Sequence, residues 1–170
     1  MNPDLLQRVM PYAGARASVF AQPLTDAMTR WGIDSPIRQA MFLANIAAET
    51  ASLSEIVERS DGSAYIDRMG NQTPLEARLY IGRGCLQVTG HDNYAACGQA
   101  LNLPLLTNPT YLEQPEWAAQ SAGWFWATNG LNEVADKRQF GSVCHRINGG
   151  WNGIDERIEC YRIACKALGL

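Results

Sequence analysis

The chain has 170 residues and a formal net charge of −3, with 46% hydrophobic and 18% charged residues. This length fits a single domain spanning residues 1–170, and the composition is that of a globular protein rather than a disordered chain. The slightly acidic balance argues against nucleic acid as the main partner. No run of 18 apolar residues occurs, so we expect no membrane insertion. We expect the protein to be a monomer.

The N-terminal segment carries Pro3 and Asp4 where a secretion signal needs a basic start followed by an apolar run. We therefore expect synthesis in the cytoplasm without a signal peptide. The number of cysteines is odd, and none of them stand in Cys-x-x-Cys spacing. This pattern predicts reduced, mostly buried thiols and no metal site. The five cysteines are Cys85, Cys97, Cys144, Cys160 and Cys165.

Apolar periodicity and capping signals predict a succession of helices. Ser35 followed by Pro36 marks a helix start, and the residues up to about Ser52 present one apolar face. Pro23 is expected to break the run between Ala15 and Trp31 into two pieces. In chain order, the predicted helices cover about residues 3–10, 15–31 in two pieces, 36–52, 92–101, a short one opening at 108–109, 115–128, 139–147 and 154–168.

The pattern changes between Arg59 and Gly90, where glycines and turn-forming residues are frequent and helical periodicity disappears. Within this stretch, residues 85–89 alternate in polarity and include β-formers, which predicts a small hairpin or sheet. The predicted fold class is therefore mainly α, with one small β-rich insert and a single core.

Two glutamates are candidates for acid–base chemistry. Glu49 lies near the end of a predicted helix, with Phe42 and Ile46 on the same side. A partly desolvated carboxyl group keeps its proton longer, as a general acid must. Glu58 follows nine residues later, beyond the helix end, so the pair has the potential to flank a cleft, as glycoside hydrolysis requires. Spacing does not distinguish Glu58 from Glu55, and solvated surface carboxylates are the more common explanation of such a pattern.

A second candidate region is rich in glycine and tyrosine. On a strand, Gln87 and Thr89 share one face, and an amide beside a hydroxyl suits uncharged, hydroxyl-rich ligands such as sugars. Tyr80 and Tyr94 are candidates for stacking on pyranose faces. A polar strand face exposed to solvent explains the same pattern without any ligand. The Gly-Arg-Gly sequence lacks the residues that complete a phosphate-binding loop.

The turn before the last predicted helix contains three glycines and two asparagines within residues 148–153. Asn148 fits either a helix C-terminal cap or a ligand-binding amide beside an open backbone. Arg157, one turn into the following helix, is a candidate partner for a cleft carboxylate, although an exposed helical arginine is usually just solvated.

Taken together, these segments resemble glycoside hydrolase family 19, in particular its phage-endolysin and bacterial cell-wall lysozyme branch. The resemblance covers most of the chain from near Trp31 onward, and GRGxxQxTGxxNY combined with INGGxNG is a specific pairing of motifs. The matching segments are QAMFLANIAAE (39–49), YIDRMGN (65–71), YIGRGCLQVTGHDNY (80–94), SAGWF (121–125) and INGGWNG (147–153), together with Glu58 and Arg157.

The resemblance implies a lysozyme-like fold, mainly helical, with a small β element lining a substrate cleft. It makes Glu49 the general acid, Glu58 the general base and Thr89 the residue that orients the attacking water. Arg157 would support the carboxylates. The sugar-binding residues that it implies are Gln87, Asn93, Tyr94 and Asn148.

The function implied is hydrolysis of β-1,4-glycosidic bonds in peptidoglycan by an inverting mechanism, with no metal or organic cofactor. Three alternatives stay open: a chitinase acting on N-acetylglucosamine oligomers, a lytic transglycosylase, and a non-catalytic wall-binding module. The expected place of action is the cell wall, reached through a holin-type pore or by a secretion system. In the second case, an immunity protein that plugs the cleft is an expected partner.

Overall fold

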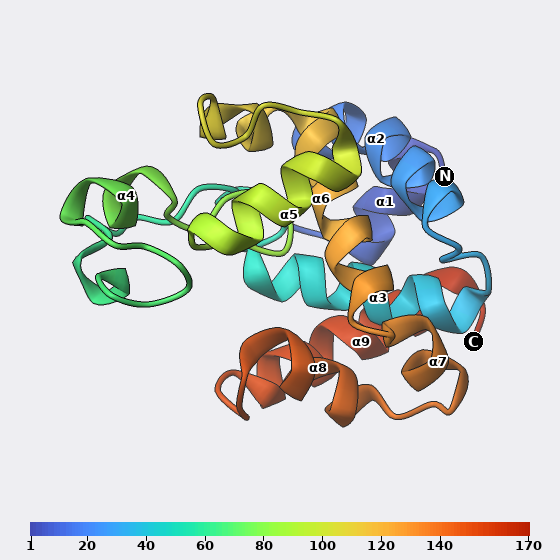
Figure 1. Cartoon of the computed structure of the whole chain (residues 1–170). Helices are drawn as coiled ribbons and strands as arrows, with labels where there is room; N and C mark the ends of the chain where they lie inside the picture. Colours follow the sequence, from blue (N-terminus) through green and yellow to red (C-terminus); the bar gives the residue numbers. More distant parts are fainter.

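The computed structural model describes residues 1–170. It is built almost entirely from helices, and every helix predicted from the sequence has a counterpart (Figure 1). The elements are α1 (Pro3–Val9), α2 (Arg16–Arg30), α3 (Pro36–Glu49), η1 (Ser63–Tyr65), α4 (Pro74–Leu79), α5 (His91–Leu101), η2 (Pro109–Glu113), α6 (Pro115–Thr128), α7 (Leu131–Asp136), α8 (Phe140–Asn148) and α9 (Ile154–Leu168), where η denotes a 3-10 helix.

Helix α3 runs through the middle of the molecule and ends at Glu49 (Figure 1). The Ser35 hydroxyl accepts a hydrogen bond from the Arg38 amide, and Pro36 starts the first turn, as the sequence predicts. Every residue from Ala40 to Ala47 is buried, so α3 is surrounded by other helices rather than lying on the surface. Helix α9 packs along α3, and α2 packs against α6. This arrangement fixes the position of the last turn of α3.

The prediction that Pro23 divides the second helix is wrong, because α2 continues without interruption from Arg16 to Arg30. Proline inside a helix leaves the carbonyl four residues earlier without its usual partner. Here that residue is Val19, which is about half exposed, and water has access to this side of the helix. Phe20 and Leu24 are completely buried on the opposite side. Burying these side chains outweighs the cost of the proline, which is about 3 kcal/mol.

The predicted β element is reduced to two isolated bridges, in which Arg83 pairs with Val57 and with Val88. Residues 84–87 form a tight turn instead of a strand, closed by the pairing of Arg83 with Val88, and Gln87 has a positive φ of 52° that strand residues do not adopt. The predicted hairpin or sheet is therefore not formed beyond these single-residue pairs. Cys85 and Leu86 are buried in the helical core, and this packing decides the conformation.

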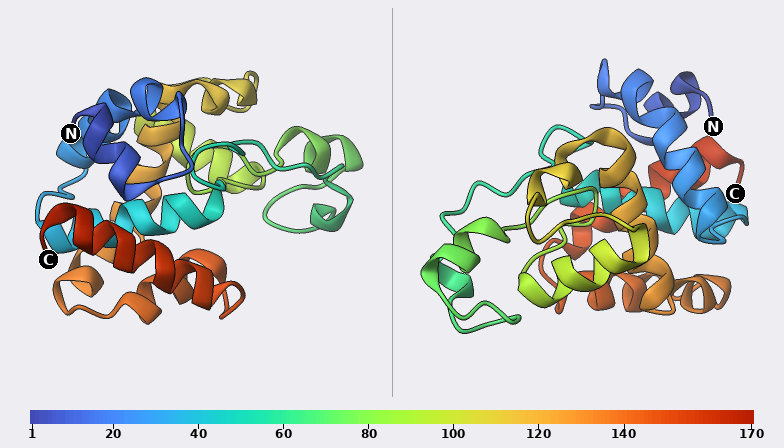
Figure 2. Two further views of the ribbon diagram at one scale, coloured as in Figure 1. Left: turned by 180° about the vertical axis from the view of Figure 1, so that it is seen from behind. Right: turned by 45° about the horizontal axis from the view of Figure 1, so that its top comes forward.

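The segment with η1 and α4 extends from the helical body to one side, and both further views agree on this (Figure 2). Helix α4 is only six residues long, too short for its periodicity to be recognised in the sequence. Its start is a capping box, in which the Thr73 hydroxyl and the Glu76 carboxylate each accept a hydrogen bond from the other's backbone amide. The short helix α7 was also not predicted.

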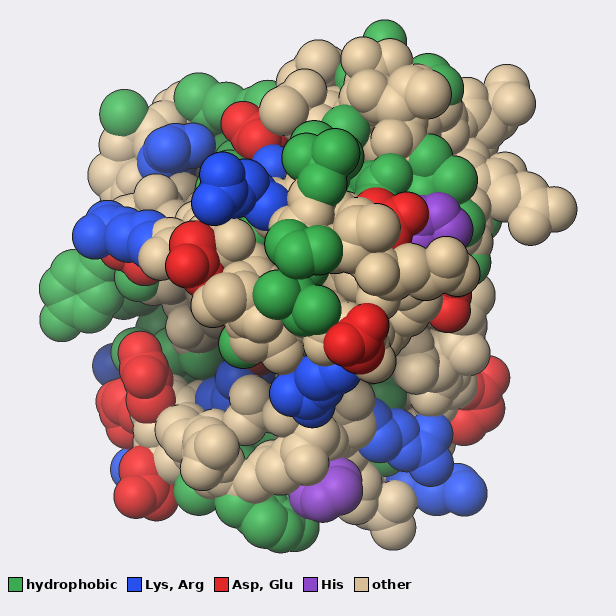
Figure 3. Space-filling model, turned by 60° about the vertical axis from the view of Figure 1, so that its left-hand side comes forward, with side chains coloured by type: hydrophobic (Ala, Val, Ile, Leu, Met, Phe, Trp, Pro, Cys, Tyr) green, Lys and Arg blue, Asp and Glu red, His purple; other side chains and the backbone are tan.

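Charged side chains of both signs are interspersed on the face shown in Figure 3, without a broad patch of one sign. All five cysteines are free, and no three His, Cys, Asp or Glu side chains are grouped as metal ligands would be. None of the helices combines the length and the apolar character that crossing a bilayer requires.

Candidate active site

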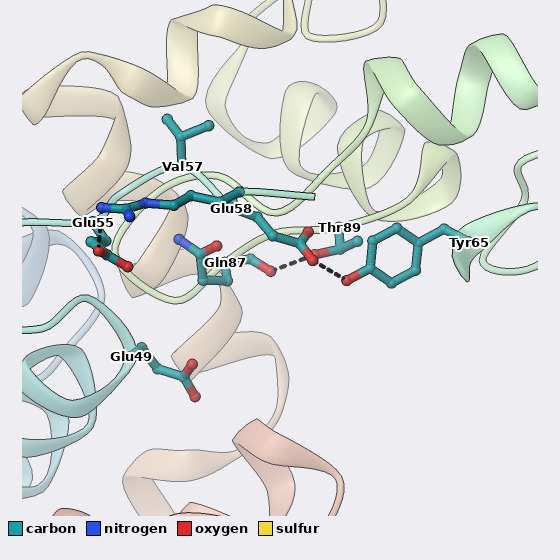
Figure 4. A pocket seen from close by; sticks show the side chains of 8 residues that line it. Glu49, Glu55, Val57, Glu58, Tyr65, Gln87 and Thr89 are labelled. Atoms are coloured by element: carbon teal, nitrogen blue, oxygen red, sulfur yellow. Dashed lines mark hydrogen bonds and ion pairs between the residues drawn. The ribbon is translucent and has the colours of Figure 1, made fainter. Parts of the chain in front are cut away.

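The C-terminal end of α3 and two loops surround a pocket of about 360 Å³. Glu49 points into this pocket from α3, while Glu58, Gln87 and Thr89 lie on the opposite side (Figure 4). These four residues are therefore brought together as the sequence predicts. The complete lining consists of Glu49, Glu55, Val57, Glu58, Arg59, Tyr65, Gln87 and Thr89.

Glu49 is held by a cation from the far end of the chain. Arg157 Nη2 donates a hydrogen bond of 2.6 Å to Glu49 Oε1, and the exposed fractions of the two side chains are 7% and 19%. Phe42 and Ile46, expected beside Glu49, are completely buried within the core. The environment of the carboxylate is thus set mainly by the guanidinium group. The second carboxylate oxygen is not engaged by Arg157, and the side chain is open to the pocket.

A buried amide holds Arg157 in turn. Asn45 is completely buried, and its Oδ1 accepts a hydrogen bond of 3.0 Å from Arg157 Nη1. Its Nδ2 donates to the Met41 carbonyl at 2.8 Å, which fixes the direction of the amide. Arg157 Nε is buried without a hydrogen-bond partner. The guanidinium therefore shares its charge with one carboxylate, Glu49, and one neutral group.

Glu58 is held by groups of a different kind. Tyr65 Oη donates to Glu58 Oε1 at 2.7 Å, and the Gly82 backbone amide donates to Oε2 at 2.9 Å. Burial and the hydrogen bond to Glu58 raise the pKa of Tyr65 to about 12, so the phenol stays protonated and acts as a donor. Glu58 is therefore held by neutral donors, whereas Glu49 is held by a cation. The two carboxylates have different surroundings in the same pocket.

Gly82 marks the point where three polar side chains converge. A Cβ atom at this position would lie 2.7 Å from Gln87 Oε1 and 3.2 Å from both Glu58 Oε2 and Thr89 Oγ1. The Thr89 hydroxyl donates to the Gln87 carbonyl at 2.9 Å, and Gln87 Nε2 donates to the Gly84 carbonyl at 3.0 Å. The turn, rather than the predicted alternation of a strand, brings both side chains to the space beside Gly82 that Glu58 also reaches.

Tyr80 and Tyr94 are not available for stacking on a sugar ring, and these two predictions are wrong. Tyr80 is 5% exposed and donates to the Leu106 carbonyl at 3.0 Å. Tyr94 is completely buried and donates to the Ile81 carbonyl at 2.7 Å. Tyr94 also accepts a hydrogen bond from the buried Arg83 at 3.0 Å. Both rings belong to a small core beneath the pocket wall.

The two predicted asparagines lie outside the pocket lining. Asn93 Nδ2 donates to the Thr89 carbonyl at 2.8 Å and so supports the wall from behind. Asn148 Nδ2 donates to the Asn152 carbonyl at 3.0 Å and closes the turn between α8 and α9. Both side chains are exposed, and their predicted contacts with sugar stay predictions. Glu55 lines the pocket but forms an exposed ion pair with Arg59 at 2.6 Å.

Three residues with clear roles in this geometry were missed: Tyr65, Gly82 and Asn45. Tyr65 and Gly82 stand inside motifs noted in the sequence, but nothing in the motifs indicates which carboxylate they contact. Asn71 joins Tyr65 to the start of α5, because its side-chain amide donates to the Tyr65 carbonyl and accepts from the His91 backbone amide, both at 3.0 Å.

The helical fold thus brings two carboxylates with different hydrogen-bond partners to one pocket. Residues 49–152 match the family described as Chitinase class I, and the chain belongs to this family, glycoside hydrolase family 19. The family resemblance noted in the sequence and the mainly helical, lysozyme-like fold are thereby confirmed.

Two curated relatives illustrate the similarity. "Endochitinase At2g43620" of Arabidopsis thaliana is 41% identical over 138 residues, which cover 77% of this chain and 48% of the relative. A "Glycosyl hydrolase family 19 domain-containing protein" of Haemophilus influenzae is 36% identical over 100 residues, 58% of this chain and 48% of the relative. The chain thus spans about half the length of these curated relatives.

Among solved structures, chitinase C from Streptomyces griseus superposes with a TM-score of 0.80 at 28% sequence identity. The superposition covers 99% of this chain and 76% of chitinase C, so the similarity extends over all helices described above.

Proposed function

We propose that the chain is a glycoside hydrolase that cleaves β-1,4 bonds between N-acetylglucosamine units of chitin oligomers. The observation that carries this proposal is the placement of Glu49 and Glu58 in one pocket with different hydrogen-bond partners. A glycosidase needs two carboxyl groups in unequal environments, because one donates a proton while the other accepts one. The endochitinase and chitinase names of similar proteins support the choice of chitin.

In the proposed reaction, Glu49 in its protonated form donates its proton to the glycosidic oxygen as the bond from this oxygen to C1 breaks. Water forms the new bond to C1 from the opposite face and gives its proton to Glu58. Tyr65 and the Gly82 amide hold the Glu58 carboxylate in position for this transfer. Arg157 stabilises the negative charge that remains on Glu49 after it donates its proton.

Thr89 is the proposed partner of Glu58 in holding the water molecule. Its proton is engaged by the Gln87 carbonyl, so the lone pairs of the hydroxyl oxygen remain to accept a hydrogen bond from water. A water molecule that donates one proton to Thr89 and the other to Glu58 presents its own lone pair to the reacting carbon. The convergence of both oxygens on Gly82 supports this arrangement.

Peptidoglycan is the second candidate substrate. The motifs at 80–94 and 147–153 resemble the cell-wall lysozyme branch of the family, and peptidoglycan shares with chitin the β-1,4 linkage between N-acetylated sugars. In this case the enzyme would reach the wall through a pore or a secretion system.

Incubation with chitin hexamer and, separately, with purified peptidoglycan tests both candidates by mass spectrometry of the products. Hydrolysis adds the mass of one water, whereas a lytic transglycosylase leaves anhydro ends that lack it. Glu49→Gln keeps the size of the side chain but has no acidic proton, and we expect a loss of at least ~10²-fold in rate. Products from neither substrate, or unchanged rates in a folded Glu49→Gln variant, would overturn the proposal.

The stereochemistry of the first product tests the role of Glu58. Inverting enzymes leave room for water between carboxyl groups roughly 6.5–9.5 Å apart. Direct attack of this water on a β-linkage yields the α-anomer first, which proton NMR of a fresh digest detects. An initial β-anomer would instead show retention and remove Glu58 from the role of base.

A further inference from the structure

A second hollow, which we call the α8–α9 groove, lies between these two helices and the turn that joins them. It encloses about 600 Å³, more than the candidate active site, and shares no lining residue with it. Its apolar lining comes from Phe140 on α8, Trp151 in the turn, and Ile154, Ile158 and Tyr161 on α9.

The groove contains an aromatic floor and an exposed indole. The rings of Phe140 and Tyr161 are stacked, with centroids 4.2 Å apart and an angle of 11° between their planes. Trp151 is 60% exposed and Ile158 is 42% exposed, although both are large apolar side chains. A Cβ atom at Gly141 would lie 3.4 Å from the Trp151 ring, so this glycine lets the indole rest close to α8. A hollow lined mainly by apolar and aromatic side chains, with a few polar groups among them, has the usual form of a ligand-binding site.

The polar lining of the groove indicates the chemistry of its ligand. It consists of Arg138, Gln139 and Ser142, and no carboxylate lines the groove. The candidate active site, by contrast, is lined by three glutamates. Flat aromatic surface next to amide, hydroxyl and guanidinium donors suits a ligand with apolar ring faces and polar edges. A pyranose ring with hydroxyl and N-acetyl groups has this character, and an aliphatic or strongly cationic partner does not.

Helix α9 contributes residues to the groove and to the support of the candidate active site. Arg157 reaches Glu49 on one side of the helix, while its neighbour Ile158 lines the groove on another. The turn between α8 and α9 lies on the same side of the molecule as the end of α3 that carries Glu49 (Figure 1). A polysaccharide consists of many chemically identical segments. One polysaccharide chain, or two neighbouring chains of a fibre, can therefore offer sugar rings to the groove and to the active site at once.

We infer that the α8–α9 groove is a second binding site for β-1,4-linked N-acetylhexosamine polymer, in which a sugar ring stacks on Trp151. The site anchors the enzyme on insoluble polysaccharide and does not take part in the chemistry. The identity of the ligand rests on the proposed function, whereas the stacking site itself is tested by binding alone.

The experiment measures binding of Glu49→Gln protein to colloidal chitin by sedimentation, so that hydrolysis does not alter the substrate. Adding Trp151→Ala is expected to raise the apparent dissociation constant about five- to tenfold. Ile158→Asn, at another residue that lines the groove, should also weaken binding. Tyr12→Ala is the matched control, because Tyr12 is an aromatic side chain 85% exposed and outside the groove.

Equal binding with and without Trp151→Ala would overturn the inference, and so would an equal loss caused by Tyr12→Ala. The inference would also be overturned if sedimentation velocity showed that the wild-type protein is a dimer and that Trp151→Ala dissociates it. In that case a second copy of the chain would fill the groove. If wild-type protein hydrolyses neither substrate but Trp151→Ala still weakens binding, the proposed hydrolase activity fails and the second site stands.

Discussion

Arg157 Nη2 donates a hydrogen bond of 2.6 Å to Glu49 Oε1 and so joins α9 to the last residue of α3, 108 positions earlier in the chain. This contact has consequences for stability as well as for the chemistry proposed above. Removing one partner of a largely buried ion pair leaves the other charge uncompensated.

Arg157→Met keeps the apolar stem of the side chain and removes only the charge and the donors. We expect the free energy of unfolding at neutral pH to fall by about 3 kcal/mol, measured by urea denaturation. Arg162→Met on the same helix is the control. Arg162 forms an exposed pair with Glu159 at 3.7 Å, and its loss should change stability by no more than about 0.5 kcal/mol. Similar losses in both variants would show that the Glu49 contact contributes little.

Gly82→Ala tests the crowding of polar groups around Glu58. The backbone at Gly82 has no positive φ, so alanine meets no conformational strain there, but its Cβ collides with Gln87 Oε1 at 2.7 Å. The displacement of Gln87, Thr89 and Glu58 should lower kcat roughly 10²-fold while the melting temperature stays close to wild type. Gly150→Ala is the matched control, because no atom lies within 4 Å of its added Cβ. An active Gly82→Ala enzyme would mean that these side chains need no fixed positions.

Thr89→Val removes a hydroxyl at nearly constant volume. If this hydroxyl steers the attacking water, its loss is felt mainly in the transition state, and we expect kcat to fall roughly tenfold while KM changes little. Thr29→Val is a suitable control. Its hydroxyl also donates to a backbone carbonyl at 2.9 Å, but in α2 and away from the pocket. A rise in KM at constant kcat would instead make Thr89 a residue that only binds substrate.

Because two thiols are buried, we expect the free energy of unfolding to fall at alkaline pH. Burial raises the pKa of Cys85 and of Cys97 to about 12, from an ordinary value of 9.0. Between these values the unfolded chain releases protons that the folded protein keeps. The stabilisation is therefore complete below about pH 9 and is lost as pH rises toward 12, by about 1.4 kcal/mol per pH unit for each thiol.

Cys85→Ala should make this alkaline decline less steep, whatever the variant loses at neutral pH through the smaller side chain. Urea denaturation of both proteins at several pH values above about 8 measures the two slopes. Parallel slopes would contradict the prediction and place the cause of any alkaline unfolding elsewhere.

Local signals were sufficient to predict most of the helices, because proline, serine and glycine at helix ends act within a few residues. They were misleading at Pro23, where burial of Phe20 and Leu24 decides the outcome. They also failed for the strand predicted at residues 85–89, because residues 84–87 form a tight turn. Contacts between distant segments decide both cases.

For the site, too, local sequence signals predict some features, whereas contacts between distant segments decide others. The positions of Glu49, Glu58, Gln87 and Thr89 around one pocket follow from motifs, even though the strand argument for the last two was wrong. The prediction that Tyr94 binds sugar is wrong, because it rests on residue type and on the family motif, and neither shows whether a side chain is buried. Only the fold shows that it is buried and that Arg83 bonds to its hydroxyl.

Both groups that secure Glu49 lie outside the stretch that defines the family, residues 49–152, with Asn45 before it and Arg157 after it. A fragment trimmed to that stretch would retain both glutamates and the whole wall around Glu58. It would nevertheless lose α9 and nearly all of α3, leaving Glu49 at a frayed chain end without its counter-charge. The smallest autonomous unit of this protein is therefore longer than its most recognisable part.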